Sequence, residues 1–298
     1  MIGALKLGHI GVFAQRYEAM LDYYTGVLGL QPVAQTATTS YLRVGVDPYA
    51  VSLHRHGSSG LQHVALLVDP KYSTADIVKD LSDAGIAGRV ETDADPWTRE
   101  LVSFTDLDGT RVELYTNVEY PSDTATSVAI APVKIGHIAR GVVDVKATCR
   151  YYERLLGFRV SDWMEDFFVF MRCSPDHHTL NFIAAPAPLF HHVAFQVSDW
   201  AHIQRACDLL AEHDIPLMWG PIRHGIGHNV SIYHLNPDGG RVELFCELDL
   251  MLDERLGYFE PRPCHEDNPQ RPKVWKLDTL RARAIWGMGP PPGWSDRR

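Results

Sequence analysis

Two sets of metal-ligand residue types recur along this sequence of 298 residues. They are His9, His63 and Glu113 in the first half, and His137, His192 and Glu243 in the second. Corresponding members lie 128, 129 and 130 residues apart, so both sets follow one repeating pattern. Two neutral imidazoles and one carboxylate leave several coordination positions of a metal ion open. Such a set suits a non-haem Fe(II) centre, with Mn(II) as the neighbouring possibility. The sequence therefore predicts two candidate metal sites.

The predicted strands that carry these residues indicate where the side chains point. In FHHVAFQV (190–197) alternate side chains face opposite sides of the strand, so His191 shares the apolar face and His192 the other one. We expect His191 to pack in the core and His192 to face a polar cavity. The same alternation in RVELF and KIGHIAR places Glu243 and His137 opposite the apolar face.

The sequence around both sets is duplicated. The matching blocks are LGHIGVF and IGHIARG, YYTGVLGL and YYERLLGF, LQHVALLV and FHHVAFQV, and DLDGTRVELY and NPDGGRVELF. A nearly constant offset over four blocks indicates tandem duplication. We predict a first domain over 1–120, a second domain over 133–248 and a C-terminal tail over 249–298 that forms an extended arm.

Each domain is itself predicted to contain two similar modules. A strand with the GH pair precedes an apolar pattern of helical spacing at 17–30, which ends at Gly29. Alternating strands at 40–46 and 50–54 follow, and then a second strand, a helix at 73–86 and further strands. The pattern is βαβββ used four times. The predicted fold class is therefore α+β, with two tandem domains that each form an open barrel-like sheet.

The residues around the two sets distinguish them. Tyr233 stands ten residues before Glu243, and His224 stands nineteen before it. The corresponding positions of the first set hold Ser103 and Ala94, which cannot do the same acid–base chemistry. We therefore place the working site in the second domain. The first set is interpreted as a non-catalytic relic whose residues now form structural hydrogen bonds.

These residues resemble a known family, the type I extradiol (catechol 2,3-) dioxygenases of the vicinal oxygen chelate superfamily. The resemblance covers both domains and the tail. IRHGIGHNVSIYHLNPDGGRVE (222–243) fits the family signature of a His, seven residues, an aliphatic residue, Tyr, a Pro-x-Gly turn and Glu. WGMGPPPGW (286–294) is also similar to the end of the catechol 2,3-dioxygenase branch.

The resemblance implies an activity and a set of roles. The enzyme would insert both atoms of O2 into a catechol next to the diol, giving a 2-hydroxymuconic semialdehyde-type product in aromatic degradation. By this resemblance Fe(II) would be bound by His137, His192 and Glu243, with Mn(II) possible; His178 would be the acid–base group, and His224 and Tyr233 would hydrogen-bond the catechol oxygens.

Some histidines and the substrate stay less defined. Strand alternation alone does not decide between His178 and the adjacent His177 as the acid–base group. The alternative for His177 is that it is a surface residue. His228 and His234 match no family position, and we interpret them as surface or supporting groups. Branches that accept carboxylated catechols carry an Arg shortly before the signature His, where this chain has Trp219, so we favour a neutral catechol.

Two alternatives remain. The first is a glyoxalase-like metal-dependent isomerase, which shares the modules but does not need His178, His224 and Tyr233. The second is a non-catalytic small-molecule-binding protein, which predicts an apolar concavity without ligand residues. Function has to be argued from the site, because one fold serves several chemistries.

Composition excludes other classes. With 28 basic and 37 acidic residues the formal net charge is −9, which disfavours nucleic acid and anionic membrane surfaces as partners. The five scattered cysteines include no CxxC pair, and no secretory signal or spanning segment is recognised. We expect a cytoplasmic protein without disulfides. By family resemblance we expect a homo-oligomer, a tetramer or larger.

Overall fold

The structure is a computed structural model of the chain. It describes residues 2–120, 129–253, 258–260, 274–276, 278, 280–292 and 294. The contacts divide it into two compact units. The first comprises 1–135 with 150–158, and the second comprises 136–149 with 159–298. Residues 150–158 therefore pack with the first unit although they follow the first strand of the second repeat.

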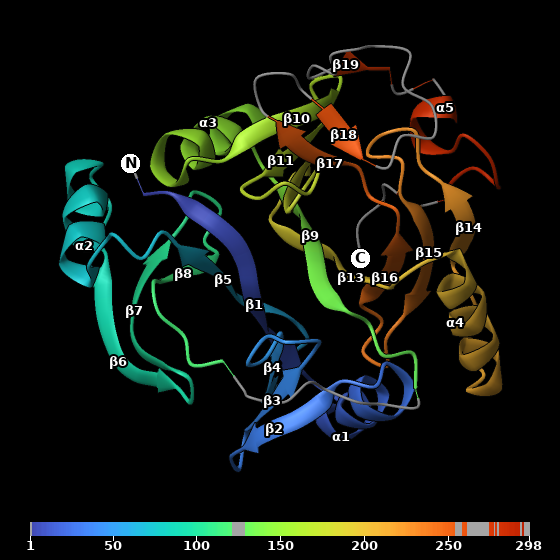
Figure 1. Ribbon diagram of the computed structural model, residues 1–298, viewed down its shortest axis with the longest axis horizontal. Coiled ribbons are helices and arrows are strands. Elements are labelled where there is room, and N and C mark those ends of the chain that lie inside the picture. The colour runs from blue at the N-terminus through green and yellow to red at the C-terminus, as the bar shows by residue number, and fades with distance from the viewer. Residues whose placement is uncertain are drawn as a thin grey trace. The chain divides into compact units, whose positions relative to one another are not determined.

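The first unit contains two βαβββ modules (Figure 1). The first module consists of β1 (Ala4–Ala14), α1 (Tyr17–Asp22) with the π-helical turn η1 (Tyr23–Val27), β2 (Gln31–Gln35), β3 (Thr39–Arg43) and β4 (Val51–Arg55). The second consists of β5 (Gly60–Val68), α2 (Thr74–Asp83), β6 (Arg89–Asp95), β7 (Thr98–Thr105) and β8 (Arg111–Tyr115).

The second repeat follows the same order. Its first module consists of β9 (Lys134–Val142), α3 (Val145–Leu156), β10 (Arg159–Met164), β11 (Phe168–Arg172) and β12 (Leu180–Ala184). Its second module consists of β13 (Leu189–Gln196), α4 (Trp200–Glu212), β14 (Trp219–Arg223), β15 (Val230–Leu235) and β16 (Arg241–Cys246). The tail adds β17 (Leu250–Asp253), β18 (Tyr258–Glu260), β19 (Val274–Trp275) and α5 (Leu280–Arg283). The predicted α+β class with four βαβββ modules is confirmed.

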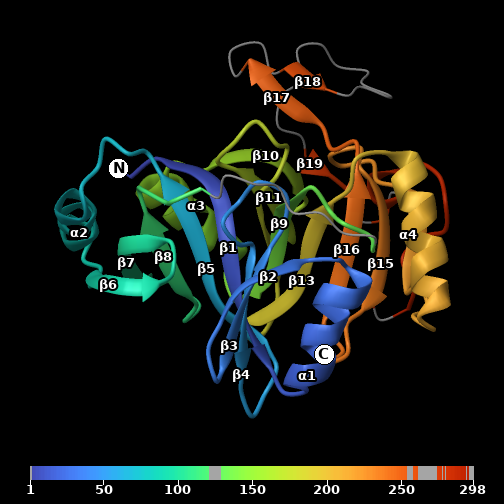
Figure 2. The same cartoon turned by 60° about the horizontal axis from the view of Figure 1, so that its bottom comes forward.

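The two large sheets have matching strand orders. One runs β2-β3-β4-β1-β5-β8-β7-β6 and the other β14-β15-β16-β13-β9-β12-β11-β10, with β19 added at the end. In each sheet the first strands of the two modules are neighbours at the centre, and each is flanked on its other side by the last strand of its own module. In the second unit α4 lies against β15 and β16 (Figure 2).

Local sequence explains the helix ends. Ser73 accepts a hydrogen bond from the Asp76 backbone N–H, and the Asp76 side chain accepts one from the Ser73 N–H, which forms a capping box before α2. The helix predicted at 17–30 is present as α1 continued by the π-helical turn. The chain turns away at Gly29, whose φ of 76° lies in the left-handed region that favours glycine.

A glycine before each first histidine of the repeat makes room for an aromatic ring. A Cβ at Gly8 would lie 1.7 Å from the Tyr115 hydroxyl oxygen, and one at Gly136 would lie 2.3 Å from Cζ of Phe245. Each of these rings lies against the histidine ring two strands away in its sheet, with centroid distances of 5.8 Å for Tyr115 and His9 and 5.1 Å for Phe245 and His137. The GH pairs of the sequence are therefore packing devices that set the position of the following histidine. Across the described residues, no helix combines the length and apolar character needed to span a bilayer.

Candidate metal centre and substrate cavity

Successive strands of the second sheet deliver successive residues of the candidate site. Glu243 lies on β16, His192 on β13 and His137 on β9, and these strands are neighbours. Tyr233 lies on β15, directly opposite Glu243 in the antiparallel register, and His224 follows β14. The strand order thus brings His137 and Glu243 together although they are 106 residues apart in the sequence.

The three candidate ligands converge on one point. The Glu243 Oε2 atom lies 3.1 Å from His137 Nε2 and 3.2 Å from His192 Nε2, and the two nitrogens are 3.4 Å apart. An ion bound at about 2.1 Å holds adjacent ligand atoms about 3.0 Å apart in an octahedral site and about 3.4 Å apart in a tetrahedral one. The observed spacings lie close to this range, so the donor set fits a divalent transition metal.

The environment of Glu243 also calls for a cation. Its side chain is 1% exposed, and among the described residues no Lys or Arg pairs with it. Its second oxygen, Oε1, accepts hydrogen bonds from Ser231 Oγ at 2.6 Å and Asn229 Nδ2 at 3.0 Å, both from uncharged groups. A buried carboxylate needs charge compensation as well as hydrogen bonds, and a metal ion between the ligands would supply it.

The pKa shifts of Glu243 and His192 favour the forms that bind a metal ion. Burial opposes ionisation of Glu243, but the charge and hydrogen bonds of His137 and His192 hold its pKa well below the usual range. Burial lowers the pKa of His192, although Glu243 partly offsets this. A carboxylate and a neutral imidazole are the forms that bind a metal ion.

His178 lies beside the triad, just before β12. Its ring centroid is 4.3 Å from that of His137, and the side chain lines the cavity. Burial, reinforced by the neighbouring His137, lowers the pKa of His178 well below its usual value, so the ring is neutral at pH 7. Of the two adjacent histidines, His178 is the one among the cavity-lining residues. The surface interpretation of His177 is wrong, because it is 1% exposed and its Nδ1 lies 3.0 Å from Nδ1 of His178.

Tyr233 and His224 form a hydrogen-bonded pair at the other side of the cavity. His224 Nδ1 lies 2.8 Å from the Arg283 carbonyl oxygen, which can only accept, so Nδ1 carries the proton. The Tyr233 hydroxyl then donates to His224 Nε2 across 2.9 Å. Burial, with the nearby Glu243 charge, raises the pKa of Tyr233 well above its usual value, so the phenol keeps its proton. Its oxygen retains lone pairs that can accept a hydrogen bond from a ligand hydroxyl.

Three other histidines are buried, and their polar contacts or their burial exclude part of the expectation for each. His191 is not an apolar core residue. Its Nε2 accepts from Arg241 Nη1 at 2.7 Å, its Nδ1 shares a hydrogen bond of 2.7 Å with His192 Nδ1, and it lines the cavity. His228 and His234 are 4% and 0% exposed, so neither is a surface residue. His228 Nδ1 pairs with the Asp249 carboxylate at 2.5 Å. His191 is buried, at 8% exposed, as strand alternation predicted, but its hydrogen bonds make it a polar group at that core position.

The triad opens into a cavity of about 90 Å³ whose walls are largely aromatic and apolar. Trp219 stacks on Tyr233 with a centroid distance of 5.2 Å and an interplanar angle of 17°. Trp294 of the tail packs on both, at 4.6 Å from Trp219 and 4.7 Å from Tyr233. Sequence reasoning missed this contribution of the tail, and the terminal WGMGPPPGW segment was the available signal. Among the described lining residues Arg283 is the single Lys or Arg.

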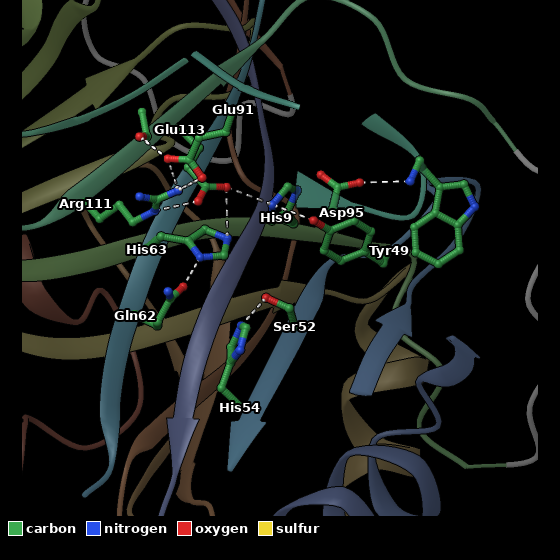
Figure 3. A network of polar contacts seen from close by, with 12 residues as sticks. His9, Tyr49, Ser52, His54, Gln62, His63, Glu91, Asp95, Arg111 and Glu113 are labelled. Carbon is green, nitrogen blue, oxygen red and sulfur yellow. Dashed lines mark hydrogen bonds and ion pairs between the residues drawn. The ribbon is translucent and has the colours of Figure 1, made fainter. Parts of the chain in front are cut away.

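The first unit brings its own three residues together on β1, β5 and β8 (Figure 3). Glu113 Oε2 lies 3.8 Å from His9 Nε2 and 3.5 Å from His63 Nε2. The registers of the two units match, because Ala65 pairs with Glu113 as Ala194 pairs with Glu243.

The surroundings of the first triad differ at the positions that matter for chemistry. The register aligns Val51 with Ile10 and Leu180 with Ile138, so Tyr49 in the first unit stands where His178 stands in the second. Ser103 pairs with Glu113 in the position of Tyr233. A small cavity of about 10 Å³ lies beside His9 and Tyr49, and neither His63 nor Glu113 is among its lining residues.

A family model of the Glyoxalase/Bleomycin resistance protein/Dioxygenase superfamily matches residues 6–114 and 134–244. The chain belongs to this superfamily, and each matched segment covers one pair of modules. The fold is the one that the resemblance predicted.

Similar proteins of known activity are ring-cleaving dioxygenases. The chain is 25% identical to the metapyrocatechase of Pseudomonas sp. (strain CF600), over 82% of this chain and 86% of that protein. It is also 25% identical to the manganese-dependent 2,3-dihydroxybiphenyl 1,2-dioxygenase of Geobacillus genomosp. 3, over 91% and 93% of the two chains.

Solved structures show the same fold. The Mn(II)-bound glyoxalase from Novosphingobium aromaticivorans superposes with a TM-score of 0.85 at 25% identity, covering 99% of this chain and 94% of that one. Homoprotocatechuate 2,3-dioxygenase from Arthrobacter globiformis gives a TM-score of 0.84 at 21% identity, with 99% and 91% coverage.

Proposed function

We propose that this protein is a metal-dependent extradiol dioxygenase that opens the ring of a catechol next to the diol, using both atoms of O2. One observation carries the proposal. A convergent triad of two histidines and a glutamate shares one cavity with a neutral histidine and a hydrogen-bonded Tyr–His pair. The dioxygenase relatives support it.

In this proposal His137, His192 and Glu243 hold Fe(II), with Mn(II) as the alternative that the manganese-dependent relative supports. The ion, when bound, supplies a Lewis-acidic centre with open positions for substrate and dioxygen. Glu243 contributes the negative charge that the bound ion requires, and Ser231 and Asn229 fix the orientation of its carboxylate.

The Tyr233–His224 pair orients the substrate and accepts a proton from it. The Tyr233 oxygen accepts a hydrogen bond from a catechol hydroxyl, while its own proton lies on the path to His224 Nε2. A ligand that lacks this hydroxyl leaves the buried pair unsatisfied, which gives selectivity for diols. His178, neutral and next to His137, then donates and takes back a proton at the oxygen that develops negative charge during cleavage.

The lining favours a catechol without a charged substituent. Phe168, Phe170, Trp219 and Trp294 give the cavity an apolar aromatic wall. Arg283 is the group that a carboxylated catechol would use. A specificity constant for a carboxylated catechol far above that for 3-methylcatechol would overturn the preference for a neutral ring.

The test is oxygen uptake by protein purified without oxygen and loaded with Fe(II) or, separately, Mn(II). Catechol, 3-methylcatechol, 2,3-dihydroxybiphenyl and a carboxylated catechol are supplied in turn, while the yellow ring-opened product is followed. Uptake with at least one catechol is expected, and its absence with all of them overturns the proposal.

The similarity to a Mn(II)-bound glyoxalase favours a second candidate, a metal-dependent isomerase. That activity needs the triad but no acid–base set of His178, His224 and Tyr233. Turnover of a glutathione hemithioacetal without oxygen consumption, and undiminished in His178→Gln, would support the isomerase instead. The cytoplasmic location and the homo-oligomeric state stay predictions, the second of which light scattering of the purified protein can test.

A further inference from the structure

The triad of the first unit has the geometry of a metal site in its own right. His9, His63 and Glu113 are 3%, 5% and 6% exposed, and their ligand atoms lie within 4.8 Å of one another. The rings of His9 and His63 meet edge to face at a centroid distance of 5.1 Å. This arrangement directs both Nε2 atoms towards the Glu113 carboxylate (Figure 3).

The orientation of His63 leaves a lone pair that nothing satisfies. Its Nδ1 contacts the Gln62 amide oxygen, which can only accept, so Nδ1 carries the proton of the neutral ring. The Nε2 atom is then an acceptor, it is buried, and it has no hydrogen-bond partner. It faces Glu113 Oε2, another acceptor, across 3.5 Å. Two buried acceptors that face each other are unfavourable unless a cation lies between them.

The charges around Glu113 leave its negative charge available. Arg111 Nε donates to Glu113 Oε1 at 2.7 Å and so fixes the carboxylate with Oε2 turned to the histidines. Arg111 is itself paired with Glu91, through Nη2 at 2.9 and 2.8 Å from its two oxygens. One guanidinium between two carboxylates leaves a net charge of about −1, which matches the charge of Glu243 in the second unit.

The site is closed on the side of Tyr49. The Tyr49 hydroxyl lies 2.7 Å from His9 Nε2, and its ring packs at 4.2 Å from His9 and 5.4 Å from Trp97. A cavity of about 10 Å³ beside His9 and Tyr49 holds at most one water molecule. An ion here would complete its coordination with the phenol oxygen or one water, as closed structural sites do.

We propose that the first unit binds one divalent transition-metal ion through His9 Nε2, His63 Nε2 and Glu113 Oε2, and that this ion stabilises the unit. The proposal departs from the interpretation of this triad as a hydrogen-bonded relic. It goes beyond the proposed ring cleavage and does not depend on it, because its test counts bound ions.

Zinc is the probe, in a background where the second site is broken. Glu243→Gln protein is freed of metal with a chelator, incubated with Zn(II), dialysed and measured for zinc per chain. We expect about one ion per chain in Glu243→Gln and none above background in the double variant Glu243→Gln/Glu113→Gln. The matched control is Glu243→Gln/Glu100→Gln, since Glu100 is an exposed glutamate of the same unit, and it should retain one ion.

Two further measurements use Glu243→Gln alone, so they do not require the double variant to fold. Zinc should raise the midpoint of thermal unfolding of Glu243→Gln, and anomalous scattering from its zinc-soaked crystals should place the ion between His9, His63 and Glu113. Zinc content near zero in folded Glu243→Gln, or an ion located elsewhere, overturns the proposal.

Discussion

The two triads of this chain share their donor residues and their strand register, and they differ in what surrounds them. In the second unit a neutral histidine, a Tyr–His pair and a cavity of about 90 Å³ adjoin the ligands. In the first unit Tyr49 and Ser103 stand at the positions of His178 and Tyr233, and the small cavity beside His9 measures about 10 Å³. The fold thus brings together a set of residues that could hold a metal twice, whereas the groups proposed to move protons and bind the substrate occur once.

The way each glutamate is held sharpens the contrast. Glu243 is oriented by two uncharged donors, Ser231 and Asn229, so its full charge faces the ligand histidines. Glu113 is oriented by Arg111, whose charge is balanced by Glu91. Loss of a hydrogen-bond partner costs more free energy in a buried network than at a surface. Removal of the donors that orient Glu243 or Glu113 should therefore weaken metal binding.

The largest difference is expected from removing one carboxylate charge from each triad. Glu243→Gln should lose the catalytic metal, and ring cleavage should fall below about 1% of the parent rate, since the metal supplies the reaction's Lewis acid. Glu113→Gln should lose an ion from the first unit and lower its thermal stability. Metal content and oxygen uptake of both variants check this. Equal losses of ring cleavage in both would erase the distinction between the units.

The next effect concerns His178, which Tyr49 replaces in the first unit. His178→Gln should keep its metal but lower kcat by about 10²–10⁴-fold, the usual contribution of a general acid–base group. His213→Gln is the matched control, because His213 is exposed at the end of α4. Metal content and steady-state kinetics are measured together, and an unchanged kcat would remove His178 from its role.

Substitution of Gly8 and Gly136 tests whether the glycine before the first histidine makes room for an aromatic ring in both units. A Cβ at Gly136 would overlap the fully buried Phe245 ring, so Gly136→Ala should lower the free energy of unfolding by about 1–3 kcal/mol. Gly8→Ala should cost a similar amount, and Tyr115→Phe should recover part of it by removing the overlapping hydroxyl. Denaturant titration provides the values. No loss in either single variant would contradict the packing.

A smaller effect should follow from the Tyr233 hydroxyl, which Ser103 does not reproduce. Tyr233→Phe keeps the ring stacked on Trp219 but removes the hydrogen bond to His224 and to a catechol oxygen. We expect kcat/KM to fall by about tenfold, the value of one or two buried hydrogen bonds. Steady-state kinetics of the parent and of Tyr233→Phe measure this. Equal kcat/KM values for the two proteins with every catechol would show that the Tyr233–His224 pair does not bind substrate.

The smallest effect concerns acid stability. Burial lowers the pKa of His234 to about 3, whereas the corresponding position of the first unit holds the apolar Phe104. Between about pH 6.5 and pH 3 the unfolded chain binds a proton that the folded His234 refuses, so stability falls as the pH falls. His234→Phe should reduce that slope by up to about 1.4 kcal/mol per pH unit. Denaturant unfolding from pH 7 to pH 4 measures it, and identical slopes would contradict the assignment.

The fold could be predicted because it follows from repeats and periodic patterns that are visible in the sequence. The four repeated blocks predicted two tandem domains, and the order of strand and helix patterns inside each domain predicted two βαβββ modules. Strand alternation predicted that His137, His192 and Glu243 lie opposite the apolar face of their strands. These are local periodicities, and the duplication made each of them visible twice.

The remainder depended on packing between distant segments. Alternation placed His191 in the apolar core, but its hydrogen bonds to Arg241 and His192 turn it into a support of the site. The tail was expected to be an extended arm, whereas Trp294 and Arg283 line the cavity. The equivalence of Tyr49 and His178 became visible only in the register, because the two residues share no motif.

The most direct test of the central claim is the stoichiometry of oxygen uptake by the Fe(II)-loaded parent and by Glu243→Gln. The account predicts one O2 consumed per catechol by the parent, with a yellow ring-opened product, and no uptake by the variant. Iron-loaded parent protein that consumes no oxygen with any catechol, or a Glu243→Gln variant that cleaves at the parent rate, would contradict it.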